Sequence, residues 1–248
     1  MKRGLCLAVL LAVSACPLFS RIELDSLLAQ IDQRSRSYAD YKNFSMAVLS
    51  FSRFMDKAWQ PEKVVRTEKK IYTQEGRSRQ EIIRATEIKD GVEKDITQTA
   101  AAEAAKAREK AAENSKDSQQ SREKKFELEE LLPFAVDKRP FYRFVLLADT
   151  TMENRRLLCI RAKTIDQEEE RFEGLYYIDP QTRDVRMIDI RPSKNPKFVK
   201  ELHMRMSFDV LPGDRLILTH TWMRIYAGIL VKKVRLEVEE TYSDYRFE

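Results

Sequence analysis

Hydrophobic and polar positions alternate with a period of two over much of this chain. The clearest case runs from Leu202 to Val210, where Leu202, Met204, Met206, Phe208 and Val210 share one parity and His, Arg, Ser and Asp take the other. Successive side chains of a strand point to opposite faces of its sheet. The pattern therefore predicts a strand with one apolar and one polar face.

Similar patterns predict antiparallel strands along most of the chain. The expected strands are 44–55, 63–72, 77–88, 141–148, 156–164, 172–178, 185–191, 202–210, 215–225 and 229–242. Turn-forming residues separate several of them, at Gln74-Glu75-Gly76, Lys89-Asp90-Gly91, Asp179-Pro180-Gln181-Thr182, Pro212-Gly213-Asp214 and Ala227-Gly228. Short links between consecutive strands indicate a meander. A sheet of about ten or eleven strands is expected to curl, because strand twist accumulates.

Three further segments are predicted to be helical or to cover the sheet. Residues 21–39 place Ile22, Leu27, Leu28 and Ile31 near one stripe at helical spacing. Residues 97–125 contain no large apolar side chain but are rich in Ala, Glu, Lys and Arg, which favour a helix without an apolar face to bury. This segment is interpreted as a polar insertion, either a tolerated loop expansion or a mobile flap over a binding mouth. Residues 126–135 form a short apolar stretch that is expected to pack on the sheet.

The start of the chain has the order of a secretory signal. Lys2 and Arg3 precede the apolar run 5–13, and small residues follow it. The run is too short for a membrane-spanning helix, which needs about 20 residues. The sequence Val13-Ser14-Ala15-Cys16 resembles the lipobox of bacterial lipoproteins, which predicts a signal peptide at 1–15 and a lipid anchor on Cys16. A plain signal peptidase that cuts after Ala15 or Ser20 is the alternative.

Charge and cysteine content narrow the function classes. The formal net charge is +5, and removal of Lys2 and Arg3 with the signal would leave +3, with acidic and basic residues mixed. No basic stripe with interleaved aromatic residues supports nucleic-acid binding. Cys6 would leave with the signal, and Cys16 is the candidate lipid site. Cys159 would then be the one remaining thiol, so no internal disulfide framework is expected. Its apolar strand context indicates a buried structural thiol.

The sequence offers no recognisable catalytic or metal-binding set. His203 and His220 lie in predicted strands at spacings that do not suit a metal ion, and no phosphate loop or nucleophile elbow is present. We therefore expect no catalytic residue, no metal site, no cofactor and no enzymatic activity. A hydrolase of envelope lipid or glycan is the least supported alternative.

Strand parity also predicts which residues form a wide apolar face. The expected cavity residues are Phe44, Met46, Leu202, Met204, Met206, Phe208, Leu216, Leu218, Trp222, Leu236 and Val238. Few helical segments are available to cover this face, which favours an apolar pocket or groove. Methionine suits a pocket for flexible chains because it adapts to irregular shapes. Ordinary core packing is the alternative.

These features together resemble the LolA/LolB-like superfamily of outer-membrane lipoprotein-sorting and carrier proteins. The resemblance rests on the signal, the N-terminal helix, the meander, the Asp179-Pro180 turn between Tyr176-Tyr177-Ile178 and Val185-Arg186-Met187, and the closing residues 239–247. It implies a mainly β (α+β) fold in which a curved antiparallel sheet forms an incomplete β-barrel capped by helices. It also implies a single domain over 16–248, with 97–125 as a departure from the family pattern.

The resemblance implies a function in binding rather than catalysis. Family members hold acyl chains of lipids or lipoproteins in the concave cavity, so the expected function is outer-membrane lipoprotein sorting or lipid transfer. The expected location is the periplasm, with a tether to the outer membrane if Cys16 carries lipid. An envelope module that senses lipid and passes the signal to a partner protein is the alternative.

Overall fold

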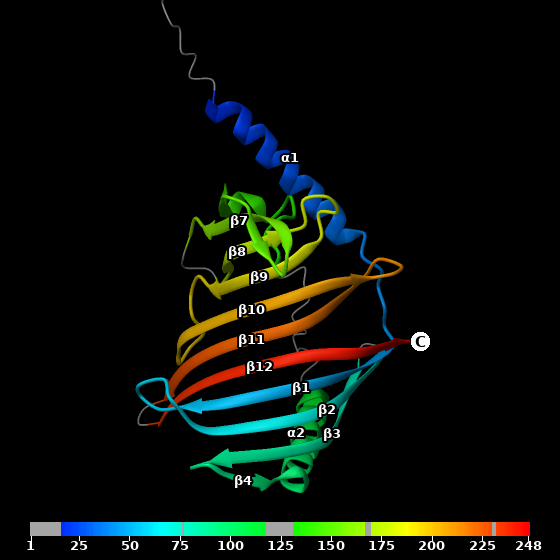
Figure 1. Ribbon diagram of the computed structural model, residues 1–248, viewed down its shortest axis with the longest axis vertical. Helices are drawn as coiled ribbons and strands as arrows, with labels where there is room; N and C mark the ends of the chain where they lie inside the picture. The colour runs from blue at the N-terminus through cyan, green and yellow to red at the C-terminus, as the bar shows by residue number, and fades with distance from the viewer. Residues whose placement is uncertain (1–15, 76, 118–130, 167–169, 230–231) are drawn as a thin grey trace, which may run out of the picture.

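One antiparallel sheet makes up most of the computed structural model, which describes residues 16–75, 77–117, 131–166, 170–229 and 232–248 (Figure 1). The predicted signal peptide 1–15 and residues 118–125 of the predicted insertion lie outside these ranges. The strands are β1 (Phe44–Met55), β2 (Pro61–Gln74), β3 (Arg77–Lys89), β4 (Val92–Asp95), β5 (Tyr142–Leu146), β6 (Thr150–Met152), β7 (Arg155–Thr164), β8 (Phe172–Ile178), β9 (Val185–Pro192), β10 (Val199–Leu211), β11 (Arg215–Ile229) and β12 (Lys232–Phe247).

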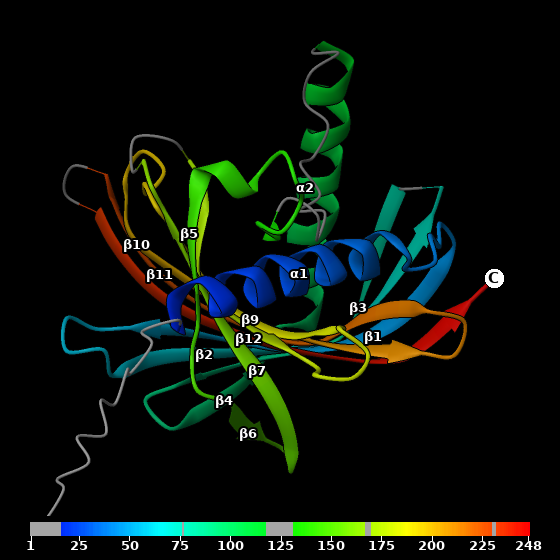
Figure 2. The ribbon, with the colours of Figure 1, turned by 90° about the horizontal axis from the view of Figure 1, so that it is seen from above.

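The strand order combines two meanders that meet at the first and last strands. It runs β4-β3-β2-β1-β12-β11-β10-β9-β8-β7-β5, with β6 paired to β7. β1 and β12 pair antiparallel, so the N-terminal meander continues the sheet formed by the rest of the chain. The sheet is strongly curved, but its two edges do not pair with each other, as expected for an incomplete barrel (Figure 2). The predicted mainly β fold is confirmed.

Both long helices lie on the concave side of the sheet (Figure 2). They are α1 (Cys16–Arg36) and α2 (Thr97–Asp117), and a short 3-10 helix, η1, spans Arg139–Phe141. Leu28 and Ile31 of α1 are buried in one cluster with Ile188 and Ile190 of β9 and Met204 of β10. Helix α1 therefore closes one half of the concave face as an ordinary hydrophobic core.

Residues 131–134 complete the cover of this half. Leu131 and Phe134 are buried in the same cluster as α1, and the hydroxyl of Tyr176 donates to the carbonyl oxygen of Leu131 at 3.0 Å. The rings of Phe134 and Tyr176 make an edge-to-face contact with centroids 5.1 Å apart. The described part of the short apolar stretch thus packs on the sheet, as predicted.

A buried carboxylate fixes the end of α1 to the β8–β9 turn. The side chain of Asp184 is 3% exposed and accepts a hydrogen bond from Arg34 Nε at 2.7 Å. It also accepts from the hydroxyls of Tyr38 and Thr182. Burial and the neighbouring Asp184 raise the pKa of Tyr38 above its ordinary value, which keeps the phenol protonated as a donor.

Most predicted strands are present, but one predicted turn is wrong. Ala227 and Gly228 lie inside β11, opposite Val234 and Lys233 of β12. A glycine without Asn, Asp or Pro beside it is compatible with a strand interior, so the dipeptide did not mark the end of the strand. The short strands β4 and β6 were not predicted. Across the described ranges, no helix is long and apolar enough to cross a membrane.

Candidate functional site

The concave face carries almost all of the residues predicted from strand parity. Directly opposed residues of antiparallel strands share a face, and Met204 of β10 lies opposite Met223 of β11, which lies opposite Val238 of β12. The register extends this face to β1 through the pair Ser52 and Val238. The predicted residues on it are Phe44, Met46, Leu202, Met204, Met206, Phe208, Leu216, Leu218, Leu236 and Val238.

Trp222 lies on the opposite, convex face, so its assignment to the cavity was wrong. It is paired with Arg205 and makes an edge-to-face contact with the ring of His203, 5.2 Å between centroids. The register of β10 and β11 shifts between Ser207 and Phe208, because β11 carries one extra residue there. Such a bulge exchanges the two faces of a strand, which simple alternation from Leu218 could not reveal.

The helix-covered half of this face is packed rather than hollow. Met204 is 6% exposed within the core cluster, and Leu202, Met206 and Phe208 pack against that cluster. For these residues the alternative of ordinary core packing is correct.

Aromatic side chains pack around the end of the face near the C-terminus. The ring of Phe44 lies 5.1 Å from that of Tyr41 and 6.3 Å from that of Tyr245. The hydroxyls of Tyr41 and Tyr245 donate to the carbonyl oxygens of Leu216 and Leu218. This cluster ties the segment before β1 to the strands at the centre of the sheet.

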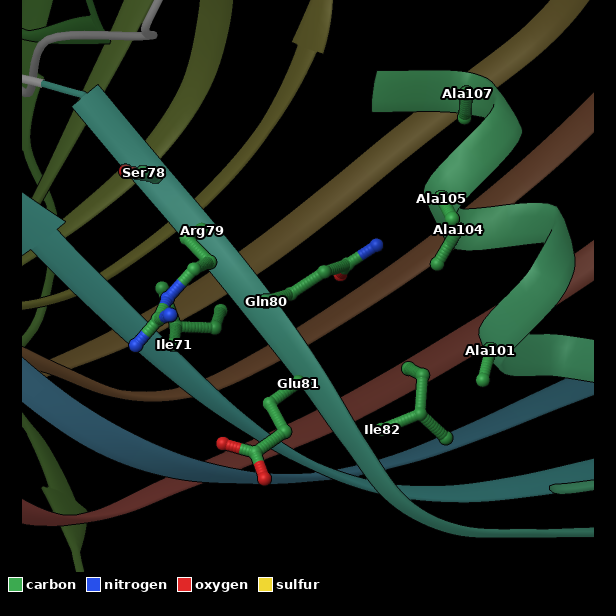
Figure 3. A pocket seen from close by; sticks show the side chains of 10 residues that line it. All are labelled: Ile71, Ser78, Arg79, Gln80, Glu81, Ile82, Ala101, Ala104, Ala105 and Ala107. Atoms are coloured by element: carbon green, nitrogen blue, oxygen red, sulfur yellow. The ribbon is translucent and has the colours of Figure 1, made fainter. Parts of the chain in front are cut away.

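Helix α2 stands at the other end of the sheet, where it contacts β3 (Figure 2). A groove of about 570 Å³ lies between β3 and the helix, lined by Ile71, Ser78, Arg79, Gln80, Glu81, Ile82, Ala101, Ala104, Ala105 and Ala107. Gln80 and Ile82 point from β3 toward α2, whereas Arg79 and Glu81 point to the other side of the strand (Figure 3). Because alanines fill little space, the helix stands over the sheet without closing on it.

The start of α2 is held against β3 by its first residue. The hydroxyl of Thr97 accepts from the backbone N–H of Ala85 at 3.0 Å and donates to the carbonyl oxygen of Ala85. Asp95 Oδ1 accepts from the backbone N–H of Thr97 at 2.8 Å. These bonds hold the start of the predicted polar insertion at β3, and its described part is a largely exposed helix that rises from the concave side of the sheet (Figure 2).

A charged pair lies on the concave face beside this groove. Lys69 Nζ of β2 is 2.9 Å from Glu240 Oε1 of β12, and their side chains are 17% and 20% exposed. The hydroxyl of Tyr242 donates to Glu240 Oε2 at 2.6 Å. Burial raises the pKa of Glu240, but Lys69, Tyr242 and Ser50 lower it by more, so the carboxyl stays ionised at neutral pH. Burial and Glu240 raise the pKa of Tyr242.

Sequence reasoning missed this pair although one signal was available. Leu236, Val238 and Glu240 share a parity, so a carboxylate interrupts the apolar row of β12. Lys69 likewise falls two positions before Ile71 on the same face of β2. A charged residue in an apolar row indicates a buried partner, but the row alone does not identify that partner.

The titratable residues that the sequence singled out elsewhere are partnered or buried. His203 Nε2 lies 2.5 Å from Asp189 Oδ1, and His220 Nε2 lies 3.3 Å from Glu239 Oε1, both on the convex face. Cys159 is a buried free thiol, as predicted, and burial raises its pKa. Among the residues with described positions, no three His, Cys, Asp or Glu side chains are grouped to hold a metal ion.

Comparison with solved structures returned matches at low sequence identity. A domain described as an outer membrane lipoprotein-sorting protein from Vibrio parahaemolyticus is 10% identical, with 89% of this chain and 92% of that chain covered and a TM-score of 0.38. A LolA superfamily protein from Nitrosomonas europaea is 12% identical, with 90% and 92% covered and a TM-score of 0.32. MucB in complex with MucA from Pseudomonas aeruginosa is 7% identical, with 91% and 99% covered and a TM-score of 0.28.

Comparisons at the sequence level returned nothing. No protein-family model and no curated protein matches the chain.

Proposed function

We propose that this chain is a cell-envelope protein that binds the acyl chains of lipids or lipoproteins on the concave face of its sheet. One observation carries the proposal: α1 packs tightly on one half of that face, whereas a groove of about 570 Å³ stays open between α2 and β3. Small-molecule sites typically measure about 300–1,000 Å³ and are mostly apolar. The groove has this size, and Ile71, Ile82 and α2 alanines supply its apolar surface.

An acyl chain suits such a groove for energetic reasons. Each buried methylene contributes about 0.8 kcal/mol, so about ten of them contribute about 8 kcal/mol. Before the cost of ordering the chain, that free energy corresponds to a Kd of about 1 μM.

The envelope location and the lipid anchor rest on the sequence. Residues 1–15 have the order of an export signal, and Cys16 follows the lipobox-like residues Val13-Ser14-Ala15. We propose that Cys16 becomes the lipidated N-terminus of a periplasmic protein tethered to the outer membrane. Helix α1, which begins at Cys16, would then connect that anchor to the core.

The proposed binding is tested with purified protein in two steps. Native mass spectrometry of protein isolated from envelope extracts should show bound lipid, and a fluorescent fatty acyl probe should bind with a micromolar Kd. Ala105→Trp fills the groove from α2 and should weaken probe binding at least tenfold. Ala102→Trp, on the same helix but outside the groove lining, is the matched control and should change it little.

Two results would count against this function. Protein that is uniformly empty and takes up no acyl probe contradicts it directly. Equal probe binding by the Ala105 and Ala102 variants would place binding elsewhere than the groove. An empty protein that captures a stoichiometric partner from envelope extracts would favour the regulatory alternative.

A further inference from the structure

We infer that Lys69 and Glu240 form a polar subsite that recognises the ester or amide carbonyl of an esterified acyl chain and disfavours a free fatty acid. The inference rests on the proposed function, because it names the ligand class for the same groove. The two residues are 171 positions apart in the sequence and meet only on the concave face. Neither sequence motif nor mechanism accounts for a charged pair at this place.

The pair is adjacent to the apolar groove. Lys69 of β2 lies opposite Ile82 of β3, and Ile71 follows two residues later on the same face. Ile71 and Ile82 both line the groove under α2. A chain that lies along these residues therefore has its polar end within reach of the Lys69 ammonium group.

The subsite has spare hydrogen-bond donors and few spare acceptors. An ammonium group has three donors, and Lys69 directs one of them to Glu240. Both carboxylate oxygens of Glu240 are already engaged, by Lys69 and by Tyr242. An incoming group is therefore matched to this subsite if it accepts hydrogen bonds, as a carbonyl oxygen does.

The charge of the pair separates esters from acids. Glu240 neutralises Lys69, so a free carboxylate entering beside Lys69 also meets a second carboxylate and must lose its hydration. An ester or amide carbonyl is uncharged and accepts from Lys69 without that repulsion. The subsite is thus expected to favour chains attached to glycerol, to a cysteine or to an amine.

The inference is tested by competition against a bound fluorescent acyl probe. Methyl decanoate and decanoate have the same chain and differ in the head group. In the unaltered protein, methyl decanoate should bind at least tenfold more tightly than decanoate at neutral pH. Glu240→Gln removes the repelling charge while Lys69 stays, so the ratio should shift at least tenfold toward decanoate.

The adjacent residue provides the control. Glu239 lies on the convex face, where it pairs with Arg53 at 2.8 Å, so Glu239→Gln removes the same charge from the other side of the sheet. It should leave the ester-to-acid ratio unchanged. If Glu240→Gln does not fold, the double variant Lys69→Met/Glu240→Met removes both charges together. In the double variant, the preference of the protein for methyl decanoate over decane should be at least fivefold smaller than in the unaltered protein.

The outcomes distinguish this inference from the proposed function. If the unaltered protein binds ester and acid equally, or prefers the acid, the inference is overturned while acyl binding stands. An unchanged ratio in Glu240→Gln, or an unchanged ester advantage in the double variant, overturns it as well. If the unaltered protein binds no acyl compound, the proposed function fails and the inference fails with it.

Discussion

Replacing Gly174 by alanine should destabilise the sheet beneath α1 severely. An added Cβ at this position would lie 2.1 Å from the backbone oxygen of Asp189 and 2.8 Å from the Cα of Ile190. Real Cβ contacts are essentially never shorter than 3.0 Å, so β8 and β9 must separate by about 0.9 Å. The obstacle is backbone, which cannot rotate away as a flexible side chain can.

The expected cost follows from what this separation disrupts. Two weakened ladder hydrogen bonds cost about 1 kcal/mol each, and overpacking adds about 1–3 kcal/mol. Tyr176 and Ile190, both at most 1% exposed, lie in the affected strands and would lose core contacts. We therefore expect a loss of about 3–5 kcal/mol from a domain whose total stability is typically 5–15 kcal/mol.

Urea unfolding followed by tryptophan fluorescence measures this loss. Gly91→Ala is the control, because Gly91 has a φ of 76° but nothing within 4 Å of its added Cβ. It isolates the cost of a left-handed backbone, about 1–2 kcal/mol. A Gly174 variant no less stable than the Gly91 variant would refute the steric argument and the β8–β9 register on which it depends.

Three further predictions concern the helix anchor, the pH response and the membrane. Asp184→Ala leaves Arg34 without its buried partner and should cost about 3–5 kcal/mol in urea unfolding, against at most about 1 kcal/mol for Glu68→Ala in an exposed pair; equal losses would contradict the anchor. Burial raises the pKa of Asp189, but hydrogen bonds from His203 and Arg205 lower it by more. The pKa of Asp189 is therefore lower in the folded than in the unfolded chain. The ionised carboxylate stabilises the fold above about pH 4, and this stabilisation is lost as the pH falls and Asp189 is protonated. Asp189→Asn should therefore reduce the decrease in the free energy of unfolding between about pH 6 and 3, and an unchanged pH dependence would refute this. Cys16→Ala should release the protein from membranes, and unchanged fractionation would refute the lipid anchor.

Much of the fold was predictable because strand formation leaves a local signal. The alternation of Leu202 to Val210 gave both the strand β10 and its apolar face. The strands Phe44–Met55 and Phe172–Ile178 begin and end where their aromatic and apolar runs do. The period-two rule needs only the residues of one strand, so it holds wherever a strand is regular.

The candidate site was less predictable because its parts come from distant segments. Trp222 was misplaced because a bulge in β11 shifts the face, and a bulge is decided by how two strands pair. The groove depends on α2 standing over β3 through alanines, which carry no pattern of their own for a partner. Neither feature is encoded in a short stretch of residues.

The sequence by itself determined ten of the twelve strands, the apolar parity of the regular ones and helical segments within 21–39 and 97–125, because these depend on neighbours within a few positions. Only the tertiary structure decided that β1 pairs with β12, that α1 fills half of the concave face, and that Lys69 meets Glu240. In strand pairing and helix docking, each segment can pair with many alternative partners in the chain, and these alternatives compete. Their outcome depends on total buried area and backbone geometry, which no single segment contains.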